Sequence, residues 1–410
     1  MSKKRIVITG IGIVSPIGIG REQFWDNLFA GKSGIKPITL FDTSNLKVKV
    51  AGEITDFDAK TILGKKGLVD LDRATRLLLA ATKFCLEDSD IQINENNSVS
   101  TGVCVGTTFG SLNSFSEFDR SSLIDGPHFV NPSRFPNIVI NSPASRVGIR
   151  YVIKGLNATI STGTCAFLDA LNYAVHALSN DRVERVIVGA VEEMCEQTMI
   201  GLQRMNYMAG LNGVSPCSRP FDKRREGIVF SEASTAFLVE TLDSAIKRHA
   251  RIYGEINSLS AVFDPYSLYK FNSKGQGMYK AMKESLISAN LNLQDVDCIF
   301  ANANSTRNAD FLETKMIKKV FKAFTKTIPV TAVKSMVGET MSSSGGISLA
   351  AALGSISEEM IPPTVNYEVK DPFCDLDYVI NTSRKKSIDK AMINTFSPHG
   401  SHNSLIVGAV

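Results

Sequence analysis

Apolar runs alternate with helix-spaced apolar positions along the chain. The run at residues 5–14 (RIVITGIGIV) is β-rich and almost continuously apolar, and a helical pattern follows at 23–30. Further runs of this kind lie at 100–106, 157–162 and 185–191, and helical spacing fills 166–178. A continuous apolar run predicts a strand buried on both faces, and strand–helix–strand order predicts a parallel βαβ unit.

The second half of the chain shows the same kind of order. Strands are predicted at 235–240, 297–303, 328–333, 391–396 and 404–410, and helices at 276–289, 310–323 and 344–360. The alternation makes the fold class α/β. A division near residue 250 gives halves 1–250 and 251–410 of similar character. The letters show no clear repeat, so the idea of a duplication rests on element order alone.

Composition narrows the class of protein. The chain has 410 residues, 43% hydrophobic and 21% charged, which is typical of a globular protein and not of a disordered one. A net charge of +4 is too mild to indicate nucleic-acid binding, although it suits an acidic carrier protein. No apolar run approaches the ~18 residues of a membrane span, and the start has no signal-peptide core. Seven cysteines without CxxC spacing predict reduced thiols, no metal site and a cytoplasmic location.

Residues 9–15 (TGIGIVS) contain a G-x-G after a strand, which invites a dinucleotide-binding interpretation. Ser15 occupies the place of the third glycine, and no acidic ribose partner follows at the expected distance. The segment is therefore interpreted as a plain tight turn, and no bound cofactor is expected.

Cys165 is the candidate nucleophile. It lies in STGTCA at 161–166, where an apolar strand gives way to a helix. A thiol at a helix start faces unpaired N–H groups and the positive end of the helix dipole, which stabilise a thiolate. The local sequence leaves open a buried structural cysteine at a tight turn.

Several ordered motifs resemble the β-ketoacyl-acyl-carrier-protein synthases of the elongating, thiolase-fold type. They are NATISTGTCAFLDAL at 157–171, VITGIGIVSPIG at 7–18, FPNIVINSPASRVGIRYVIKG at 135–155, SRPFDKRREG at 218–227 and TAVKSMVG at 331–338. The resemblance covers nearly the whole chain. It implies a duplicated five-layer α-β-α-β-α fold that dimerises, and acyl chains carried on the phosphopantetheine arm of an acyl carrier protein.

Both histidines of the resembled family are replaced. In that family a cysteine takes the acyl chain, and two histidines assist decarboxylation and stabilise the charge on the thioester oxygen, a contribution of ~10²–10³ per donor. Asn304 stands in place of the first histidine and Glu339 in place of the second. Asn304 can still donate one hydrogen bond. An ionised Glu339 cannot, and a carboxylate near Cys165 would raise the pKa of the thiol.

Other family positions are kept or rearranged. Lys334 is retained, and one expectation is that it forms an inert ion pair with Glu339. The glycine-rich loop appears as NTFSPHGSHN at 394–403, which keeps Phe396 but lacks the usual gating phenylalanine. Two histidines of this loop, His399 and His402, are interpreted as polar loop residues, with displaced catalytic groups as the alternative. The remaining histidines, at positions 128, 176 and 249, match no catalytic motif.

Three functions remain open. The favoured one is a chain-length-factor-like subunit that pairs with an active ketosynthase, as in type II polyketide synthases, and shapes the chain pocket without condensing on its own. The second is acyl transfer or thioester hydrolysis through Cys165, which needs a nucleophile and an oxyanion hole but lacks a visible general base. The third, an intact condensing enzyme with histidines supplied from elsewhere, would require two motifs to be rebuilt. All three predict carrier protein as a partner, and none predicts nucleic acid or membrane.

Overall fold

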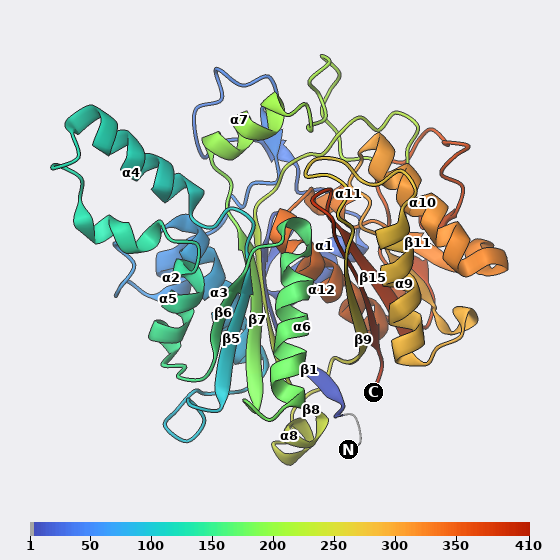
Figure 1. The fold of residues 1–410 in the computed structure, drawn as a ribbon, viewed down its shortest axis with the longest axis horizontal. Coiled ribbons are helices and arrows are strands. Elements are labelled where there is room, and N and C mark those ends of the chain that lie inside the picture. Colours follow the sequence, from blue (N-terminus) through green and yellow to red (C-terminus); the bar gives the residue numbers. More distant parts are fainter. Residues whose placement is uncertain (1–3) are drawn as a thin grey trace.

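A large mixed sheet forms the centre of the protein, and helices cover it on both sides (Figure 1). The computed structural model describes residues 4–410. In spatial order the strands are β13 (Asp377–Tyr378), β11 (Pro329–Thr331), β10 (Cys298–Phe300), β15 (Lys390–Phe396), β16 (Ser401–Gly408), β9 (Gly254–Phe263), β1 (Ile6–Ser15), β8 (Ala233–Thr241), β7 (Arg185–Glu192), β5 (Thr101–Gly106) and β6 (Asn157–Ile160), with β2 (Gly18–Ile19) beside β1. Two small ribbons pair β3 (Lys36–Pro37) with β4 (Val50–Ala51), and β12 (Met360–Ile361) with β14 (Arg384–Lys385).

The helices fall between these strands in chain order. They are α1 (Arg21–Phe29), α2 (Ala59–Leu63), α3 (Arg73–Asp88), α4 (Leu112–Asp125), α5 (Ser142–Tyr151), α6 (Ala166–Ser179), α7 (Glu196–Arg204), α8 (Leu242–Lys247), α9 (Gln276–Ala289), α10 (Arg307–Phe321), α11 (Lys334–Val337) and α12 (Ser344–Glu358). Short 3₁₀ turns are η1 (Pro132–Asn137), η2 (Gly163–Cys165), η3 (Leu293–Asp295), η4 (Lys322–Lys326) and η5 (Met341–Ser343).

Strand order repeats in the two halves of the sheet. Toward the centre, the first half runs β6, β5, β7, β8, β1 and the second runs β11, β10, β15, β16, β9, with the two-residue strand β13 outside β11. When the five main strands of each half are numbered in chain order, both halves therefore show the same spatial order: third, second, fourth, fifth, first. The halves meet where Val7 and Ile8 of β1 pair antiparallel with Glu255 and Gly254 of β9. The predicted α/β, thiolase-like fold is confirmed.

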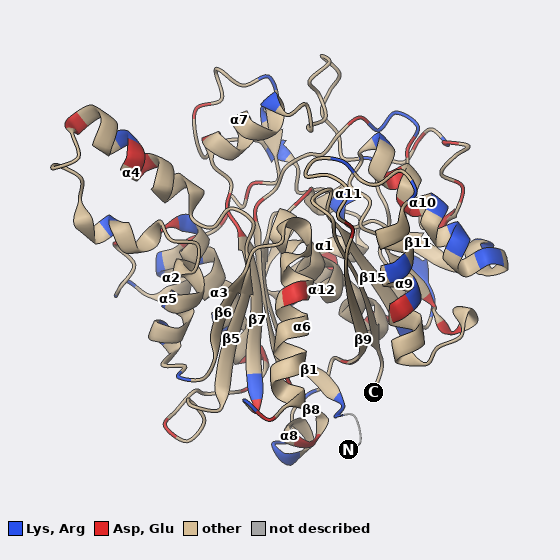
Figure 2. Ribbon diagram, viewed as in Figure 1, with Lys and Arg blue, Asp and Glu red and all other residues tan. Residues whose placement is uncertain are grey.

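Helices α6 and α12 contact strands of both halves. Helix α12 is buried from Ser344 to Ser355, and its small residues let neighbouring strands and helices approach closely. A Cβ on Gly346 would lie 2.1 Å from Thr235 Oγ1. The strands at the centre of the sheet carry few charged residues (Figure 2), as expected for strands covered on both faces. No helix among residues 4–410 is both long and apolar enough to cross a bilayer.

The glycines of the TGIGIVS segment have a packing role. The interpretation of this segment as a tight turn is wrong, because Gly10 and Gly12 both lie inside β1, against α3. A Cβ on Gly12 would lie 1.9 Å from the Ala81 carbonyl oxygen, and one on Gly10 would lie 2.7 Å from the Cys85 carbonyl oxygen. The two glycines are needed for close strand–helix approach.

The pattern of apolar positions located some elements better than others. The predicted helix 276–289 coincides with α9. The strand predicted at 297–303 ends at Phe300, because the Glu313 carboxylate accepts hydrogen bonds from the backbone N–H groups of Asn302 and Ala303. Helix α3 was not predicted, although its apolar positions are helically spaced and its charged residues lie on the less buried side. Strand β9 was missed because serines 258 and 260 occupy buried positions of the strand.

Helix α4 projects from the body at the left of Figure 1. None of its residues is buried, and its exposed large side chains include Phe115, Leu123 and Ile124. Strand β6, at the edge of the sheet, lies on the same side of the molecule. Exposed apolar side chains and an uncovered strand edge are both features that proteins usually cover with a partner.

Gly12→Ala is expected to lower the free energy of unfolding by about 3 kcal/mol or more, because the new methyl group collides with helix backbone that cannot move aside. The matched control is Gly201→Ala in α7, where no atom lies within 4 Å of the new Cβ. That control should change stability by less than about 1 kcal/mol, in the stabilising direction. Chemical denaturation of both variants measures the difference, and equal effects would contradict this packing.

Candidate active site

Cys165 is held at the junction between β6 and α6. The chain leaves β6 at Ile160, turns through η2 with Gly163 at φ 65°, and enters α6 with Cys165 as its N-cap residue. The Thr164 hydroxyl donates to the Phe396 carbonyl oxygen at 3.1 Å, which ties this turn to the end of β15. The predicted position of the cysteine at a strand-to-helix junction is confirmed.

The Cys165 thiol is fully buried and faces backbone acceptors. Its Sγ lies 3.2 Å from the Thr395 carbonyl oxygen and 3.2 Å from the Ser401 carbonyl oxygen, so its proton has two acceptors. Burial, followed by the Asp169 carboxylate, raises the pKa of the thiol to about 12. The prediction that the helix start stabilises a thiolate is therefore wrong here. Desolvation of the charged form outweighs the dipole.

Asp169 is the carboxylate that acts on the cysteine. It lies four residues after Cys165, one helical turn along α6, and accepts hydrogen bonds from the Thr162 hydroxyl and from Asn403 Nδ2 at 2.8 Å. The same Asn403 amide lies 3.3 Å from the Cys165 carbonyl oxygen. The prediction that a nearby carboxylate raises the pKa of the thiol was right, but the carboxylate responsible is that of Asp169 and not that of Glu339.

Lys334 and Glu339 form a buried ion pair. Lys334 Nζ lies 3.0 Å from Glu339 Oε2, and both side chains are almost fully buried. Asn304 Nδ2 donates to the same oxygen at 3.0 Å. The other oxygen, Glu339 Oε1, accepts from the Ser344 hydroxyl at 2.7 Å and from the Met341 backbone N–H at 3.1 Å. The expected pair is confirmed, and both carboxylate oxygens are fully engaged.

The loop that carries Asn304 is fixed by two buried carboxylates of α10. Glu313 accepts the backbone N–H groups of Asn302 and Ala303 at 2.9 and 2.8 Å, and Asp310 accepts that of Asn304 at 3.0 Å. Burial raises the pKa of Asp310 to about 6 and that of Glu313 to about 7. These acids set the position of Asn304, whose amide reaches Glu339.

The prediction that both histidines are polar loop residues is wrong for His402, which is buried within β16, whereas His399 lies in the turn of the β15–β16 hairpin. Successive side chains of a strand point to opposite faces. Asn403 faces Cys165, so His402 points to the other face, where it packs between the rings of Phe271 and Phe396. Burial lowers the pKa of His402 to about 4, and its Nδ1 has no hydrogen-bond partner among the described residues. This geometry does not let His402 act as a base on Cys165.

His399 lies in the turn of the same hairpin and is exposed. Its ring contacts Tyr269 with centroids 6.5 Å apart, and its backbone N–H donates to the Ser397 hydroxyl at 3.3 Å. A Cβ on Gly163 would lie 3.6 Å from the His399 ring, so this histidine is near the turn that precedes Cys165. It forms no hydrogen bond to the thiol.

The polar groups of this site bind one another. At the two positions where the resembled family has histidines, the Asn304 amide donates to Glu339 and the Lys334 ammonium pairs with Glu339, while Lys334 also donates to Asn302 Oδ1 at 3.1 Å. Donors aimed at a developing enolate or oxyanion must be free to bind it. In this structure Asn304 and Lys334 are both bound to Glu339.

Comparison with known proteins agrees with this geometry at the level of family. Residues 3–245 match the model of the β-ketoacyl synthase N-terminal domain, and residues 253–368 match that of the C-terminal domain. The chain is 33% identical over 414 residues to a 3-oxoacyl-[acyl-carrier-protein] synthase 2 of Coxiella burnetii, covering 100% of both chains. It is 34% identical to a protein of the same name from Synechocystis sp., covering 98% of this chain and 97% of the other.

Two solved structures share the fold over the whole length. The ishigamide ketosynthase/chain length factor superimposes with a TM-score of 0.93 at 26% identity, covering 100% of both chains. A type II polyketide synthase ketosynthase, solved in complex with its acyl-carrier protein, gives a TM-score of 0.90 at 24% identity over 100% of both chains. At 24% identity, the similarity to the second structure supports the fold and no shared role.

Sequence reasoning missed the groups that hold the thiol. Asp169 could have been found from its spacing of four residues after Cys165, since such residues share a helix face. The carbonyl acceptors of Thr395 and Ser401 carry no side-chain signal, because any residue supplies a carbonyl. The sequence showed Asn403 only as the last residue of the rearranged loop 394–403 and did not indicate its contact with Asp169.

Replacing Glu339 alone is expected to be costly. Glu339→Met leaves the Lys334 ammonium buried without its counter-charge, and should lower the free energy of unfolding by about 3–5 kcal/mol. The double variant Lys334→Met, Glu339→Met removes both charges and should be more stable than Glu339→Met. Urea denaturation of the two variants and the parent tests this. If Glu339→Met unfolds at the parent's midpoint, the ion pair as described is wrong.

Proposed function

Because this chain belongs to the β-ketoacyl synthase family, we propose that it is a non-condensing partner subunit of the chain-length-factor type. In this proposal it pairs with an active ketosynthase in type II polyketide or related acyl-chain synthesis and shapes the pocket that receives the growing chain. It uses no cofactor of its own, and the chain arrives on the phosphopantetheine arm of an acyl carrier protein.

The observation that carries the proposal is the buried contact among Asn304, Lys334 and Glu339. Decarboxylative condensation needs donors that stabilise an enolate and a thioester oxyanion. Here the groups at the two histidine positions bind each other, Asn304 Nδ2 to Glu339 Oε2 at 3.0 Å, and the retained Lys334 donates to the same oxygen at 3.0 Å. To free one donor, the buried Glu339 carboxylate would have to give up one of its four hydrogen bonds, which is unfavourable. The site is therefore stable and inert toward condensation.

The state of Cys165 points in the same direction. A thiol with a pKa of about 12 is almost wholly protonated at neutral pH, and the thiolate is the nucleophile. No histidine or other general base forms a hydrogen bond to its sulfur among the described residues. The retained cysteine thus acts as a small buried side chain whose proton is held by two carbonyl groups.

An apolar surface supports the partner in this proposal. Helix α4 exposes Phe115, Leu123 and Ile124, whose exposed fractions are 51%, 79% and 69%. Apolar side chains this exposed on one helix are typical of an interaction site. The overall likeness to a ketosynthase/chain length factor structure agrees with a ketosynthase as the partner.

The relatives named 3-oxoacyl-[acyl-carrier-protein] synthase 2 favour a different expectation, that of a condensing enzyme. The replaced histidines argue against transferring that activity to this chain. Acyl transfer or thioester hydrolysis through Cys165 is the alternative, supported by the retained cysteine and opposed by its burial.

Substitution of Cys165 distinguishes these functions. Co-expressed with a ketosynthase from the same source that has its cysteine and both histidines, the chain should form a 1:1 complex that makes product from acyl- and malonyl-carrier protein. Cys165→Ala in this chain should leave the rate of product formation within about twofold, because the thiol is protonated and buried. The matched control is the cysteine-to-alanine change in the partner, which should abolish product.

Intact-mass spectrometry completes the test. Under the proposal, no acyl adduct forms on this chain when it is incubated alone with acyl-carrier protein. An acyl adduct that disappears with Cys165→Ala and turns over would establish the acyltransferase or hydrolase alternative instead. Loss of all product with Cys165→Ala in the complex would likewise contradict the partner function.

A further inference from the structure

Helices α9 and α10 pack side by side and carry a basic face at the right of Figure 2. The exposed lysines that define this face come from the two helices and from the first residue of η4: Lys280, Lys283, Lys315, Lys319 and Lys322. A surface on which one sign of charge gathers attracts a partner of the opposite sign.

The fold, more than the composition, makes this face basic. Helix α10 contains two acids, Asp310 and Glu313, which balance part of its positive charge in the sequence. Both acids are buried, where they accept hydrogen bonds from the backbone of the loop that carries Asn304. The exposed side of α10 therefore holds cations and no acid.

Few carboxylates of the surface neutralise these lysines. Lys280 lies 3.6 Å from Glu284, and Asp375 is shared by two lysines outside the set, Lys318 and Lys326. The other four lysines of the face form no ion pair within the described range 4–410, namely Lys283, Lys315, Lys319 and Lys322.

Two of these unpaired lysines lie beside the same ring. Lys319 Nζ is 4.5 Å from the centroid of the Tyr279 ring, and Lys283 Nζ is 5.9 Å from it. The ring attracts each ammonium group, but the two like charges repel each other. An anion at this position relieves the repulsion.

An exposed aromatic pair lies at one end of the face. Phe311 precedes Lys315 by one turn of α10, and its ring contacts that of Phe373 with centroids 6.1 Å apart. Phe373 is 68% exposed, and its backbone N–H donates to Asp371 Oδ1 at 2.9 Å. Asp371 is in turn paired with the buried Arg225, so the turn holds this ring outward in a fixed place.

Lysines with an exposed aromatic ring suit a lipid surface. The ammonium group is a compact, strongly hydrated charge without the flat fork of a guanidinium, so it suits diffuse negative charge better than one oriented phosphate. A bilayer with anionic lipids offers diffuse negative charge together with an apolar layer beneath the head groups. An acidic protein face offers the charge but no apolar layer for the ring.

We propose that the basic face of α9 and α10 binds the surface of a bilayer that contains anionic lipids. Its lysines contact the head groups, and the Phe373 ring enters the layer beneath them. No membrane partner is expected from the sequence, because the burial of the two α10 acids cannot be seen there. The proposal does not rest on the partner function, since it uses neither Cys165 nor α4.

Co-sedimentation of the full chain with large unilamellar vesicles tests the charge. Vesicles of phosphatidylcholine and phosphatidylglycerol should bind the chain, less tightly as salt is added, and vesicles of phosphatidylcholine alone should not. The double variant Lys315→Gln, Lys322→Gln should weaken binding by about 10- to 30-fold, since each lysine near such a surface contributes about fivefold. Both side chains are exposed and unpaired in the described structure, so the fold does not depend on them.

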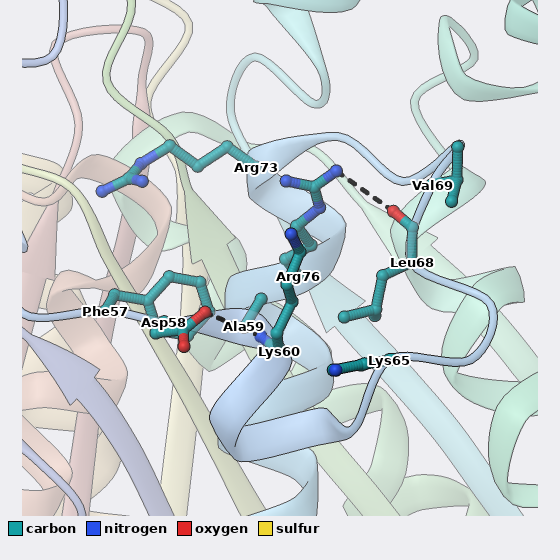
Figure 3. A pocket seen from close by; sticks show the side chains of 9 residues that line it. All are labelled: Phe57, Asp58, Ala59, Lys60, Lys65, Leu68, Val69, Arg73 and Arg76. Atoms are coloured by element: carbon teal, nitrogen blue, oxygen red, sulfur yellow. Dashed lines mark hydrogen bonds between the residues drawn. The ribbon is translucent and has the colours of Figure 1, made fainter.

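The matched control removes two lysines elsewhere. Lys60 and Lys65 are exposed, and they line a cavity of about 400 Å³ between α2 and α3 (Figure 3). Helix α2 lies on the other side of the molecule from α9 and α10 (Figure 1). Lys60→Gln, Lys65→Gln changes the net charge equally and should alter vesicle binding by less than about twofold.

Fluorescence of Phe373→Trp tests the insertion. Anionic vesicles should shift the emission of the new indole to shorter wavelength, as the ring leaves water. Trp25 is the one native tryptophan and is buried, so it adds a constant background. Phe129→Trp is the control, because Phe129 is 78% exposed near α4, and its emission should not shift.

Four results would overturn the proposal. They are no sedimentation with anionic vesicles, equal losses in the two double lysine variants, an unchanged emission of Phe373→Trp in the vesicle-bound chain, and a shift of Phe129→Trp instead. Equal losses would mean that net charge alone attracts the chain. A single-stranded oligonucleotide bound through Lys315 and Lys322, with no vesicle binding, would make the face a nucleic-acid surface and would also reject the proposal.

Discussion

The buried ion pair between Lys334 and Glu339 determines what the candidate site can do. Two opposite charges in a dry interior are stable only when each finds its partner and its remaining hydrogen bonds. Glu339 receives four such bonds, from Lys334, Asn304, Ser344 and the Met341 backbone. The Asn304 amide and the Lys334 ammonium both donate to this carboxylate, and on this contact rests the proposal that the chain does not condense by itself.

The same principle explains the cysteine. The start of α6 offers a positive dipole end, but complete burial and Asp169 oppose charge on sulfur, and the carbonyl oxygens of Thr395 and Ser401 accept the thiol proton. Burial thus has opposite consequences at neighbouring places. It favours the neutral thiol of Cys165, where no countercharge is paired with sulfur, and it tolerates the Lys334–Glu339 charges, which are paired at 3.0 Å.

Much of this could be predicted from the sequence, and the misses have physical causes. The α/β class, the bounds of α9 and the Lys334–Glu339 pair follow from apolar spacing and from motif positions. Helix α3 was missed although its apolar positions are helically spaced, and β9 was missed because its buried positions hold serines. The pKa of Cys165 depends on burial and on backbone carbonyl groups, which local residue pattern does not reveal. The packing role of Gly12 is likewise a property of the assembled strand and helix.

Decarboxylation of malonyl-carrier protein by the purified chain alone tests the central claim most directly. This step requires donors to the enolate and does not require a second subunit's pocket or a starter chain. With Asn304 and Lys334 bound to Glu339, the account predicts that acetyl-carrier protein forms no faster than in a sample without the chain. Decarboxylation above that background, lost when Lys334 is replaced by methionine, would show that the ion pair opens to substrate and would contradict the account.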